Sequence, residues 1–197
     1  MTQQKGFLLA MMEPPPILEE EFNAWYDTEH LAERLAVPGF ETARRYVCLA
    51  GWPRYLAFYD LASPEVTESA AYLRVAGENS SPWTRRILAR VRGNYRAAGI
   101  QLHPGSATSA RTGRALLLRF SALAAGDEPA VLAGLAASFA RRPETAQYRL
   151  FAAGVGERRD LLAFVEVLAP YPAEVLDLAA FGPAAAALDL VNSYARY

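Results

Sequence analysis

The chain has 197 residues, of which 52% are hydrophobic and 21% are charged, and its formal net charge is −1. This balance is typical of a globular protein with ample core material, and it predicts no binding to nucleic acid or to an anionic membrane. The single cysteine, Cys48, excludes an internal disulfide, and the lack of a His/Cys cluster predicts no metal site. No apolar stretch approaches the roughly 20 residues that span a bilayer, and the N-terminus lacks a signal-peptide pattern. We therefore expect a cytoplasmic protein.

The first half of the chain predicts a strand, a helix, two strands, a second helix and a last strand. These elements are expected, in that order, at residues 6–12, 17–34, 40–49, 55–61, 63–73 and about 94–102. The first helix is indicated by Phe22, Trp25 and Glu29, which share one stripe at helical spacing. The second helix opens with a proline, Pro64, at its first position, as helices often do.

The second half of the chain repeats this order. Its strands and helices are expected at residues 114–123, 128–140, 145–154, 161–169, 172–181 and 188–197. The closest internal match is between RYLAFYDLASPEV and RDLLAFVEVLAPYPAEV, at residues 54–66 and 159–175. We therefore predict two units of β-α-β-β-α-β order, at residues 1–103 and 114–197, joined by a linker at 104–113 that is rich in Gly, Ser and Thr.

Such a unit forms a four-stranded antiparallel sheet with both helices on one face. The strand at 55–61 carries bulky residues on both faces, since Tyr55 and Tyr59 alternate with Leu56 and Phe58. Both faces of the sheet are therefore expected to be buried. We predict an α+β fold in which two tandem ferredoxin-like units pack sheet against sheet into a barrel, with a pocket between the sheets.

The stretch EFNAWYDTEHLAERLAVPGFETARRY, residues 21–46, resembles the EthD-like proteins of the dimeric α/β-barrel superfamily. In that family the first helix carries an F…W/Y…EH pattern, followed by a Pro-Gly-Phe turn and a strand that contains arginine. The resemblance covers the first half strongly and the second half in topology only, so it implies a tandem-duplicated form of the fold. The superfamily includes cyclases, isomerases, dehydratases, cofactor-free monooxygenases, haem enzymes and members of no known activity, so the fold alone chooses no reaction.

His30 is one of two histidines and the main catalytic candidate. Imidazole titrates near neutral pH, so His30 is suited to general acid or base chemistry. The resemblance implies that the matching histidine ends the first helix at the edge of the cavity. The alternative is a structural histidine that interacts with the dipole at the end of its own helix.

Glu29 lies in the apolar stripe of the same helix, where a carboxylate must be paired or must have a raised pKa. Arg44 and Arg45 on the following strand are its expected partners, in a structural ion pair or in a ligand site. Alternation places Arg44 and Tyr46 on one face of that strand and Arg45 on the other. Which of the two arginines faces the cavity stays open.

The distribution of aromatic residues distinguishes the two halves. The first helix of the second half contains only Phe139 as an aromatic residue and has no histidine, although the packing needs of the two helices should be alike. This asymmetry favours a ligand site in the first half, where tyrosine hydroxyls and an arginine suit a planar ligand with phenol, enol or carboxylate groups. The candidate binding residues are Trp25, Tyr26, Glu29, Arg44, Arg45, Tyr46, Tyr59 and Trp83.

Two functional hypotheses follow. The first is a cofactor-free cyclase, isomerase or dehydratase that acts on an aromatic or polyketide-like metabolite, with His30 as the acid or base. The second is a non-catalytic accessory or ligand-binding protein of a catabolic pathway. A haem protein is a third alternative, in which His30 would be the axial ligand. A homodimer is also possible, because edge strands are expected to remain.

Overall fold

The computed structural model describes residues 4–154, 156–171 and 176–197. Within them, none of the helices is long and apolar enough to cross a membrane. The strands of the first half are β1 (Gly6–Glu13), β2 (Phe40–Ala50), β3 (Tyr55–Leu61) and β4 (Arg92–His103). Those of the second half are β5 (Arg114–Ala124), β6 (Thr145–Ala153), β7 (Arg158–Val167) and β8 (Leu188–Arg196). Each lies where the sequence predicts a strand.

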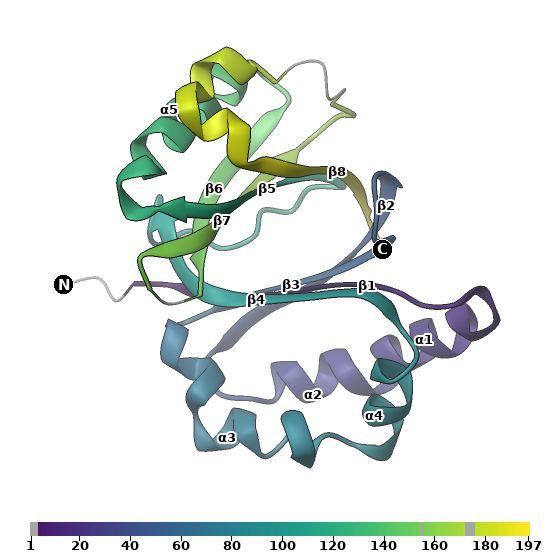
Figure 1. Ribbon diagram of the computed structural model, residues 1–197. Helices are drawn as coiled ribbons and strands as arrows, with labels where there is room; N and C mark the ends of the chain where they lie inside the picture. The colour runs from purple at the N-terminus through teal and green to yellow at the C-terminus, as the bar shows by residue number, and fades with distance from the viewer. Residues whose placement is uncertain (1–3, 155, 172–175) are drawn as a thin grey trace.

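The strands form one closed antiparallel barrel in the order β1-β3-β2-β8-β5-β7-β6-β4. The order β4-β1-β3-β2 in the first half recurs as β8-β5-β7-β6 in the second half, in the same direction around the barrel, which is the ferredoxin-like arrangement of each unit. The two sheets join where β2 pairs with β8 and where β4 pairs with β6. Figure 1 shows the two sheets stacked, with a helical layer below one and above the other. The predicted fold class is confirmed.

Closure of the barrel corrects the expectation of free edge strands. Every strand of the described residues has a partner on both sides, so the two halves satisfy each other within one chain. Closure removes the unpaired backbone groups that would otherwise attract a second copy of the sheet. The proposed division at 104–113 stays a prediction, and this segment contains no helix or strand.

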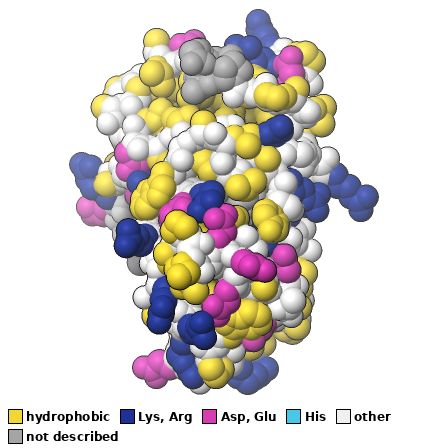
Figure 2. Space-filling view, turned by 90° about the vertical axis from the view of Figure 1, so that its right-hand side faces the viewer, with side chains coloured by type: hydrophobic (Ala, Val, Ile, Leu, Met, Phe, Trp, Pro, Cys, Tyr) yellow, Lys and Arg dark blue, Asp and Glu magenta, His cyan; other side chains and the backbone are white. Residues whose placement is uncertain are grey.

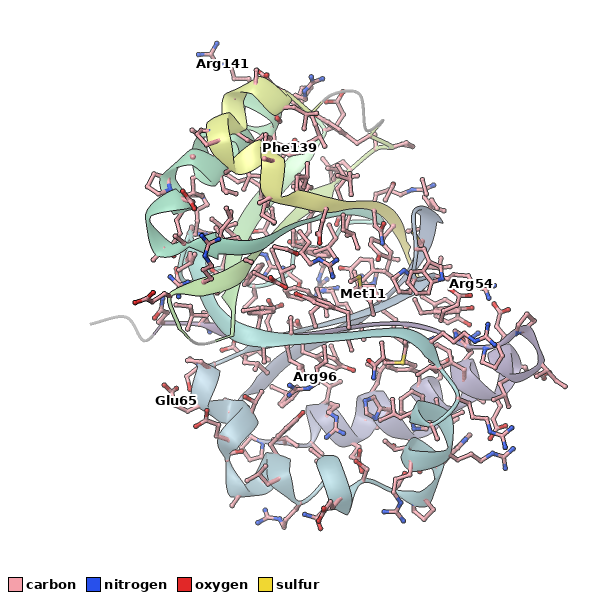
Figure 3. The ribbon with its side chains drawn as sticks, in the orientation of Figure 1. Met11, Arg54, Glu65, Arg96, Phe139 and Arg141 are labelled. Carbon is pink, nitrogen blue, oxygen red and sulfur yellow. The ribbon has the colours of Figure 1, made fainter. Side chains whose placement is uncertain are left out.

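The space between the two sheets is filled by side chains, and the predicted pocket does not lie there. Phe58 stacks on Phe164 with ring centroids 4.7 Å apart, and Phe7 packs on Phe151 at 4.8 Å. Tyr46 also points into this core and is 1% exposed. Large rings from both halves therefore occupy the interior to the density that protein cores require. Figure 3 shows Met11 in this layer between the sheets.

One end of the barrel holds a buried ionic cluster. The Arg149 guanidinium lies 2.6 Å from Asp60 Oδ1 and 3.2 Å from Glu166 Oε2, and all three side chains are almost fully buried. The segment 104–113 joins this cluster, because the Ser109 amide donates to Asp60 at 2.8 Å and the Ala110 amide donates to Glu166 at 2.7 Å. The linker is thus held across the end of the barrel by buried carboxylates.

The predicted first helix is continuous but not uniform. It consists of η1 (Pro16–Leu18), α1 (Glu19–Trp25), the π-helical segment η2 (Tyr26–His30) and α2 (Leu31–Leu35). Phe22 and Trp25 pack onto the outer face of the first sheet, as the apolar stripe predicts. Gly39, at φ +96°, turns the chain into β2, and a side chain there would collide with Val66.

The remaining helices depart from the predictions in length. The helix expected at 63–73 is split into η3 (Pro64–Glu68) and α3 (Ala70–Leu73), followed by η4 (Gly77–Asn79). The helix α4 (Pro82–Leu88) was not expected, since the sequence predicts no element between the helix at 63–73 and the strand at about 94–102. In the second half, η5 (Ala125–Asp127) leads into α5 (Glu128–Phe139), which agrees with the prediction. The helix expected at 172–181 lies partly outside the described residues, and the 3-10 segment η7 (Leu178–Ala187) covers its end.

The surface carries mixed charge. On the face drawn in Figure 2, acidic and basic side chains alternate over the lower half of the molecule without a broad region of one sign. This pattern agrees with the small net charge of −1 and offers no extended positive surface on that face.

Candidate functional site

The main cavity lies between the outer face of the first sheet and the helices that cover it, and its volume is about 740 Å³. Strands β1, β3 and β4 form its floor, and η2, α2, α3, η4 and α4 form its walls. The lining residues on which the site depends are Trp25, Tyr26, His30, Arg34, Tyr59, Tyr72 and Arg96. The cavity is therefore inside the first half, as the aromatic asymmetry predicts, but beneath the helices rather than between the sheets.

The π-helical segment Tyr26–His30 supplies two of the residues that line the cavity, Tyr26 and His30. Its wider turn holds the His30 ring at 4.3 Å from the Trp25 ring and at 5.3 Å, edge to face, from the Tyr26 ring. Short π-helical insertions occur frequently at functional sites, because they rotate side chains that a regular helix would place elsewhere. The EH pattern therefore lies in the one irregular turn of a helix that is otherwise regular.

His30 faces the cavity in its neutral form. Burial, followed by the nearby Arg34 guanidinium, lowers the pKa of His30 from 6.5 to about 3. The sequence-based expectation that this imidazole titrates near neutral pH is therefore wrong for the free protein. At neutral pH His30 is available to accept a proton, but it carries no extra proton to donate. Its Nδ1 is buried and has no hydrogen-bond partner.

Arg34 completes this wall and was not found from the sequence. Its side chain is 4% exposed, its Nη2 donates to the Val75 carbonyl at 2.8 Å, and its guanidinium lies 5.2 Å from the Tyr72 ring centre. The other terminal nitrogen, Nη1, is buried without a partner. The available signal was its position one helical turn after His30, which places both side chains on one face of the helix.

Tyr59 approaches the same space from strand β3. Its hydroxyl is fully buried without a hydrogen-bond partner, and burial raises the pKa of Tyr59 well above 10. It therefore stays protonated and able to donate a hydrogen bond. Among the described residues that line the cavity, three buried polar atoms lack partners: His30 Nδ1, Arg34 Nη1 and Tyr59 Oη. Buried polar groups are nearly always satisfied in folded proteins, so the two donors Arg34 Nη1 and Tyr59 Oη make this cavity the candidate ligand site.

The open side of the cavity carries a second cation. Arg96 on β4 donates through Nη2 to the Tyr72 hydroxyl at 3.1 Å, and Tyr72 stacks on Phe40. Figure 3 shows Arg96 in the space between the first sheet and the helices below it. Tyr72 is therefore held between two guanidinium groups, since Arg34 contacts its ring and Arg96 its hydroxyl.

The two predicted arginines lie on opposite faces of β2, and neither lines the cavity. Arg45 faces the helices, where it lies 2.7 Å from Asp27 Oδ1 and 4.4 Å from the Tyr26 ring centre. Arg44 faces the barrel side and donates to the Ser109 carbonyl at 3.1 Å. Tyr46 shares that side, within the barrel core. The alternation of the strand was correctly predicted, but Arg44, Arg45 and Tyr46 are structural neighbours of the site and not part of its wall.

Glu29 and Trp83 connect the first helix to α4. Glu29 accepts hydrogen bonds from the Ser81 hydroxyl and, at 3.4 Å, from the Thr84 hydroxyl. The expected ion pair of Glu29 with Arg44 or Arg45 is therefore wrong. Trp83 donates its indole N–H to Glu21 at 3.2 Å and also lies outside the cavity wall. Both residues hold α4 against the first helix, over the cavity. The sequence alone does not show this contact, because the two segments lie far apart in the chain.

The remaining polar candidates lie elsewhere. His103 stacks on Tyr148, with ring centroids 5.3 Å apart. Burial raises the pKa of the Cys48 thiol to about 11, so this cysteine is not an activated nucleophile. Among residues 4–154, 156–171 and 176–197, no three His, Cys, Asp or Glu side chains are grouped so as to hold a metal ion.

Comparisons with known proteins extend the description of the fold. No protein-family model matches the sequence, and no curated protein matches it. An anthrone oxidase-like protein of known structure has a TM-score of 0.69 at 14% identity, over 99% of this chain and 92% of that one. A proposed monooxygenase from Lactobacillus acidophilus has a TM-score of 0.56 at 13% identity, over 98% and 94%. A mutant chlorite dismutase from Candidatus Nitrospira defluvii, in complex with cyanide, has a TM-score of 0.59 at 8% identity, over 100% and 92%.

At these identities the likeness establishes the fold alone. The chain has the fold of the dimeric α+β-barrel, ferredoxin-like proteins, and both sheets of the barrel come from a single chain.

Proposed function

We propose that the cavity binds a planar, oxygen-rich aromatic ligand and that His30 accepts a proton from it without a cofactor. The observation that carries this proposal is that two buried donors without partners, Arg34 Nη1 and Tyr59 Oη, belong to side chains that line one cavity together with His30. A ligand oxygen beside Arg34 and Tyr59 would satisfy both donors, which otherwise remain buried without partners. A bound ligand oxygen would thus offset the free-energy cost of burying these two donors.

The cavity walls define the class of ligand. Rings of Trp25, Tyr26 and Tyr72 provide flat apolar surfaces, which suit an aromatic or conjugated skeleton. Arg34 and Arg96 bring two guanidinium groups, which bind carboxylate, enolate or phenolate oxygen through two parallel hydrogen bonds. An aromatic or polyketide-like metabolite with phenol, enol or carboxylate groups combines both features.

Each polar residue has a role in proton transfer. The neutral imidazole of His30 accepts the proton, and the charge that develops on the ligand oxygen is stabilised by the guanidinium of Arg34 and the hydroxyl of Tyr59. Such donors are effective because they are already in place and excluded from water. Removal of a proton in this way is the first step of an isomerisation, a cyclisation or a dehydration, and equally of the oxidation of an enolisable ketone. Two structures of similar fold are described as an anthrone oxidase-like protein and as a proposed monooxygenase. These descriptions support a ligand from which a proton is removed.

Membership of the EthD-like group remains part of this proposal. It is supported by the position of the EH pattern, since His30 ends the π-helical segment at the cavity wall. The non-catalytic hypothesis uses the same cavity, because a ligand carrier needs the same donors and the same aromatic walls. The two hypotheses differ only in whether His30 takes a proton from the bound molecule.

Haem is the alternative occupant, and His30 would have to be its axial ligand as the one histidine among the described residues of the wall. Its Nδ1 lies 3.9 Å from Glu33 Oε2, beside its own helix, so this nitrogen faces a carboxylate rather than the cavity. No feature of the wall favours haem over a free organic ligand. An absorbance spectrum after addition of haem tests this directly, and a Soret band would overturn the cofactor-free proposal.

Anthrone, a planar enolisable ketone, is the probe for binding. We expect anthrone to quench tryptophan fluorescence in the wild type, because Trp25 lines the cavity, and we expect Tyr59→Phe and Arg34→Met to weaken binding. Loss of one hydrogen bond to Tyr59 should weaken affinity about fivefold, from roughly 1 kcal/mol. Tyr46→Phe is the matched control, since Tyr46 is an equally buried tyrosine on the other face of the sheet. No binding, or equal loss in both tyrosine variants, would contradict the proposed site.

Exchange of the acidic C–H protons of anthrone in D₂O measures proton transfer without any later reaction. We expect the wild type to accelerate this exchange and His30→Gln to lose about 10²–10⁴-fold of the acceleration while still binding anthrone. Binding without accelerated exchange in the wild type would refute the catalytic role of His30 and support the ligand-carrier hypothesis.

A further inference from the structure

Glu33 occupies an unusual position behind the cavity wall. Its Oε2 is buried without a hydrogen-bond partner and lies 3.9 Å from His30 Nδ1 and 3.5 Å from Arg34 Nη2. Neither distance is within the range of a good hydrogen bond. The carboxylate is therefore placed between a neutral imidazole and a guanidinium and is bonded to neither. His30 Nδ1, which also lacks a partner, faces it.

We propose that Glu33 is a positioning residue for His30, and that the negative charge developing on a ligand oxygen at Arg34 releases Glu33 to accept a hydrogen bond from His30 Nδ1–H. This inference rests on the proposed function. The bond fixes the tautomer, so that Nε2 carries the free lone pair and receives the proton of the ligand. A carboxylate that orients a histidine in this way is the third member of a proton relay of general form.

The charges explain why the switch is coupled to the ligand. Before transfer the site holds one cation, Arg34, and one anion, Glu33, while His30 and the ligand are neutral. After transfer one proton has moved from the ligand to Nε2, so the ligand anion faces Arg34 and the imidazolium faces Glu33. The net charge is unchanged, and one loose ion pair has become two close ones. Without Glu33 the new imidazolium would be buried beside Arg34 with no counter-charge.

The same arrangement accounts for the basicity of His30. In the free protein, burial and Arg34 together lower the pKa of His30 to about 3, which makes it a weak base. Burial raises the pKa of Glu33, the Arg34 charge opposes this rise, and the nearby Glu29 carboxylate adds to it. An anion at Arg34 removes the opposing charge, and a carboxylate in contact with the imidazolium raises a pKa by about 1–3 units. The basicity of His30 thus increases as negative charge develops on the ligand oxygen at Arg34.

Other titratable or charged groups near His30 come from several elements. These are Tyr26 on η2, Tyr59 on β3, Tyr72 on α3, Glu78 on η4 and Arg96 on β4. Besides Glu33, two anions are near: Glu78 lies in the exposed η4 turn, and Glu29, which precedes His30 in the chain, accepts hydrogen bonds from the Ser81 and Thr84 hydroxyls. Glu33, whose side chain is 21% exposed, is the one carboxylate, among the described residues, within 4 Å of a His30 ring nitrogen.

The test needs no ligand, because Arg34→Met removes the same charge that a bound anion would neutralise. The pKa of His30 is measured by NMR titration in four proteins: wild type, Arg34→Met, Arg34→Met with Glu33→Gln, and Arg34→Lys. His103 is the internal reference in each sample. We expect Arg34→Met to raise the pKa of His30 from about 3 by at least about 1 unit, and Glu33→Gln to abolish that rise. Arg34→Lys keeps the charge and should keep the pKa low.

An equal rise in the presence and absence of Glu33 would overturn the proposal, as would no rise in Arg34→Met. If Arg34→Met fails to fold, Arg34→Gln takes its place in the same comparison. Anthrone exchange adds a second measurement: Glu33→Gln should lower its rate at least tenfold with unchanged anthrone affinity, and Glu33→Asp should restore part of it. Failure to bind anthrone would refute the proposed function alone, since the pKa comparison uses the free protein.

Discussion

At the scale of single residues, the site depends on groups whose ionisation is shifted by burial. His30 was found from the sequence because histidine is rare in the chain, and Tyr59 because aromatic residues gather in the first half. Arg34 and Glu33 were missed, since both look like ordinary charged residues of a solvated helix turn. The role of Arg34 depends on contacts with Val75 and Tyr72, which lie about 40 residues further along the chain. A residue list from sequence therefore contains the rare side chains and omits the common ones.

The lowered pKa of His30 predicts a dependence of stability on pH. Above pH 6.5 the residue is neutral in both the folded and the unfolded chain and contributes nothing. As the pH falls from 6.5 towards 3, the unfolded chain binds a proton that the folded chain does not, so the free energy of unfolding decreases. At pH 4.5 this loss amounts to about 3 kcal/mol.

Urea unfolding of wild type and His30→Gln at pH 7 and at pH 4.5 isolates this effect. Other groups titrate in both proteins, so the difference between them reports His30. We expect the wild type to lose about 3 kcal/mol more than His30→Gln on acidification. Equal losses in the two proteins would show that His30 keeps an ordinary pKa in the folded state.

At the scale of elements, the unpredicted helix α4 connects the wall to its support. Ser81 is the N-cap of α4: its hydroxyl accepts a hydrogen bond from the Thr84 amide at 2.9 Å and donates one to Glu29 on the π-helical segment. The sequence Ser-Pro at residues 81–82 is a regular helix start, although no helix was predicted there, and the helix that it begins has seven residues. Short helices depend on such caps, since they have few internal hydrogen bonds.

Ser81→Ala tests this connection. Loss of an N-cap costs about 1 kcal/mol, and loss of a hydrogen bond to a carboxylate adds about 1–2 kcal/mol. Ser69→Ala is the matched control, because Ser69 caps α3 by accepting from the Tyr72 amide at 3.2 Å without any bond to Glu29. Urea unfolding should show a loss of about 2–3 kcal/mol for Ser81→Ala and about 1 kcal/mol for Ser69→Ala. Equal losses would mean that the bond to Glu29 adds no stability.

At the scale of the whole molecule, closure of the barrel depends on contacts between the halves. Arg149 from β6 binds Asp60 from β3 and Glu166 from β7, so this buried cluster joins both units. A buried charge that loses its partner is destabilising by about 3–5 kcal/mol. The homodimer and the cytoplasmic location stay predictions, although the closed barrel no longer requires a second chain to pair its strands.

Arg149→Met should therefore lower the free energy of unfolding by about 3–5 kcal/mol, because Asp60 and Glu166 would remain buried without a cation. The control is Arg119→Met, which breaks the more exposed pair of Arg119 with Asp189 and should cost at most about 1 kcal/mol. Chemical unfolding of both variants gives the comparison. Similar losses would indicate that the buried cluster contributes no more than a surface ion pair.

The order of the strands in each half and the burial of both strand faces followed from the sequence by itself, because they are carried by local patterns. Alternation in YLAFYDL and the helical stripe through Phe22 and Trp25 depend only on neighbours within a few residues. The same patterns also restricted the site to the first half, through its aromatic residues and its single helical histidine.

Which side of the first sheet remains hollow was decided only by the tertiary structure. Both faces of the sheet are equally apolar, so the sequence pattern does not distinguish a filled layer from an open one. The barrel interior is full because Phe58 meets Phe164 and Phe7 meets Phe151, each pair joining two strands from different halves. The space under the helices stays open because α3, η4 and α4 are short and leave a cavity of about 740 Å³. The position of a cavity depends on how segments far apart in the chain pack together, and the hydrophobic pattern within one segment does not determine this.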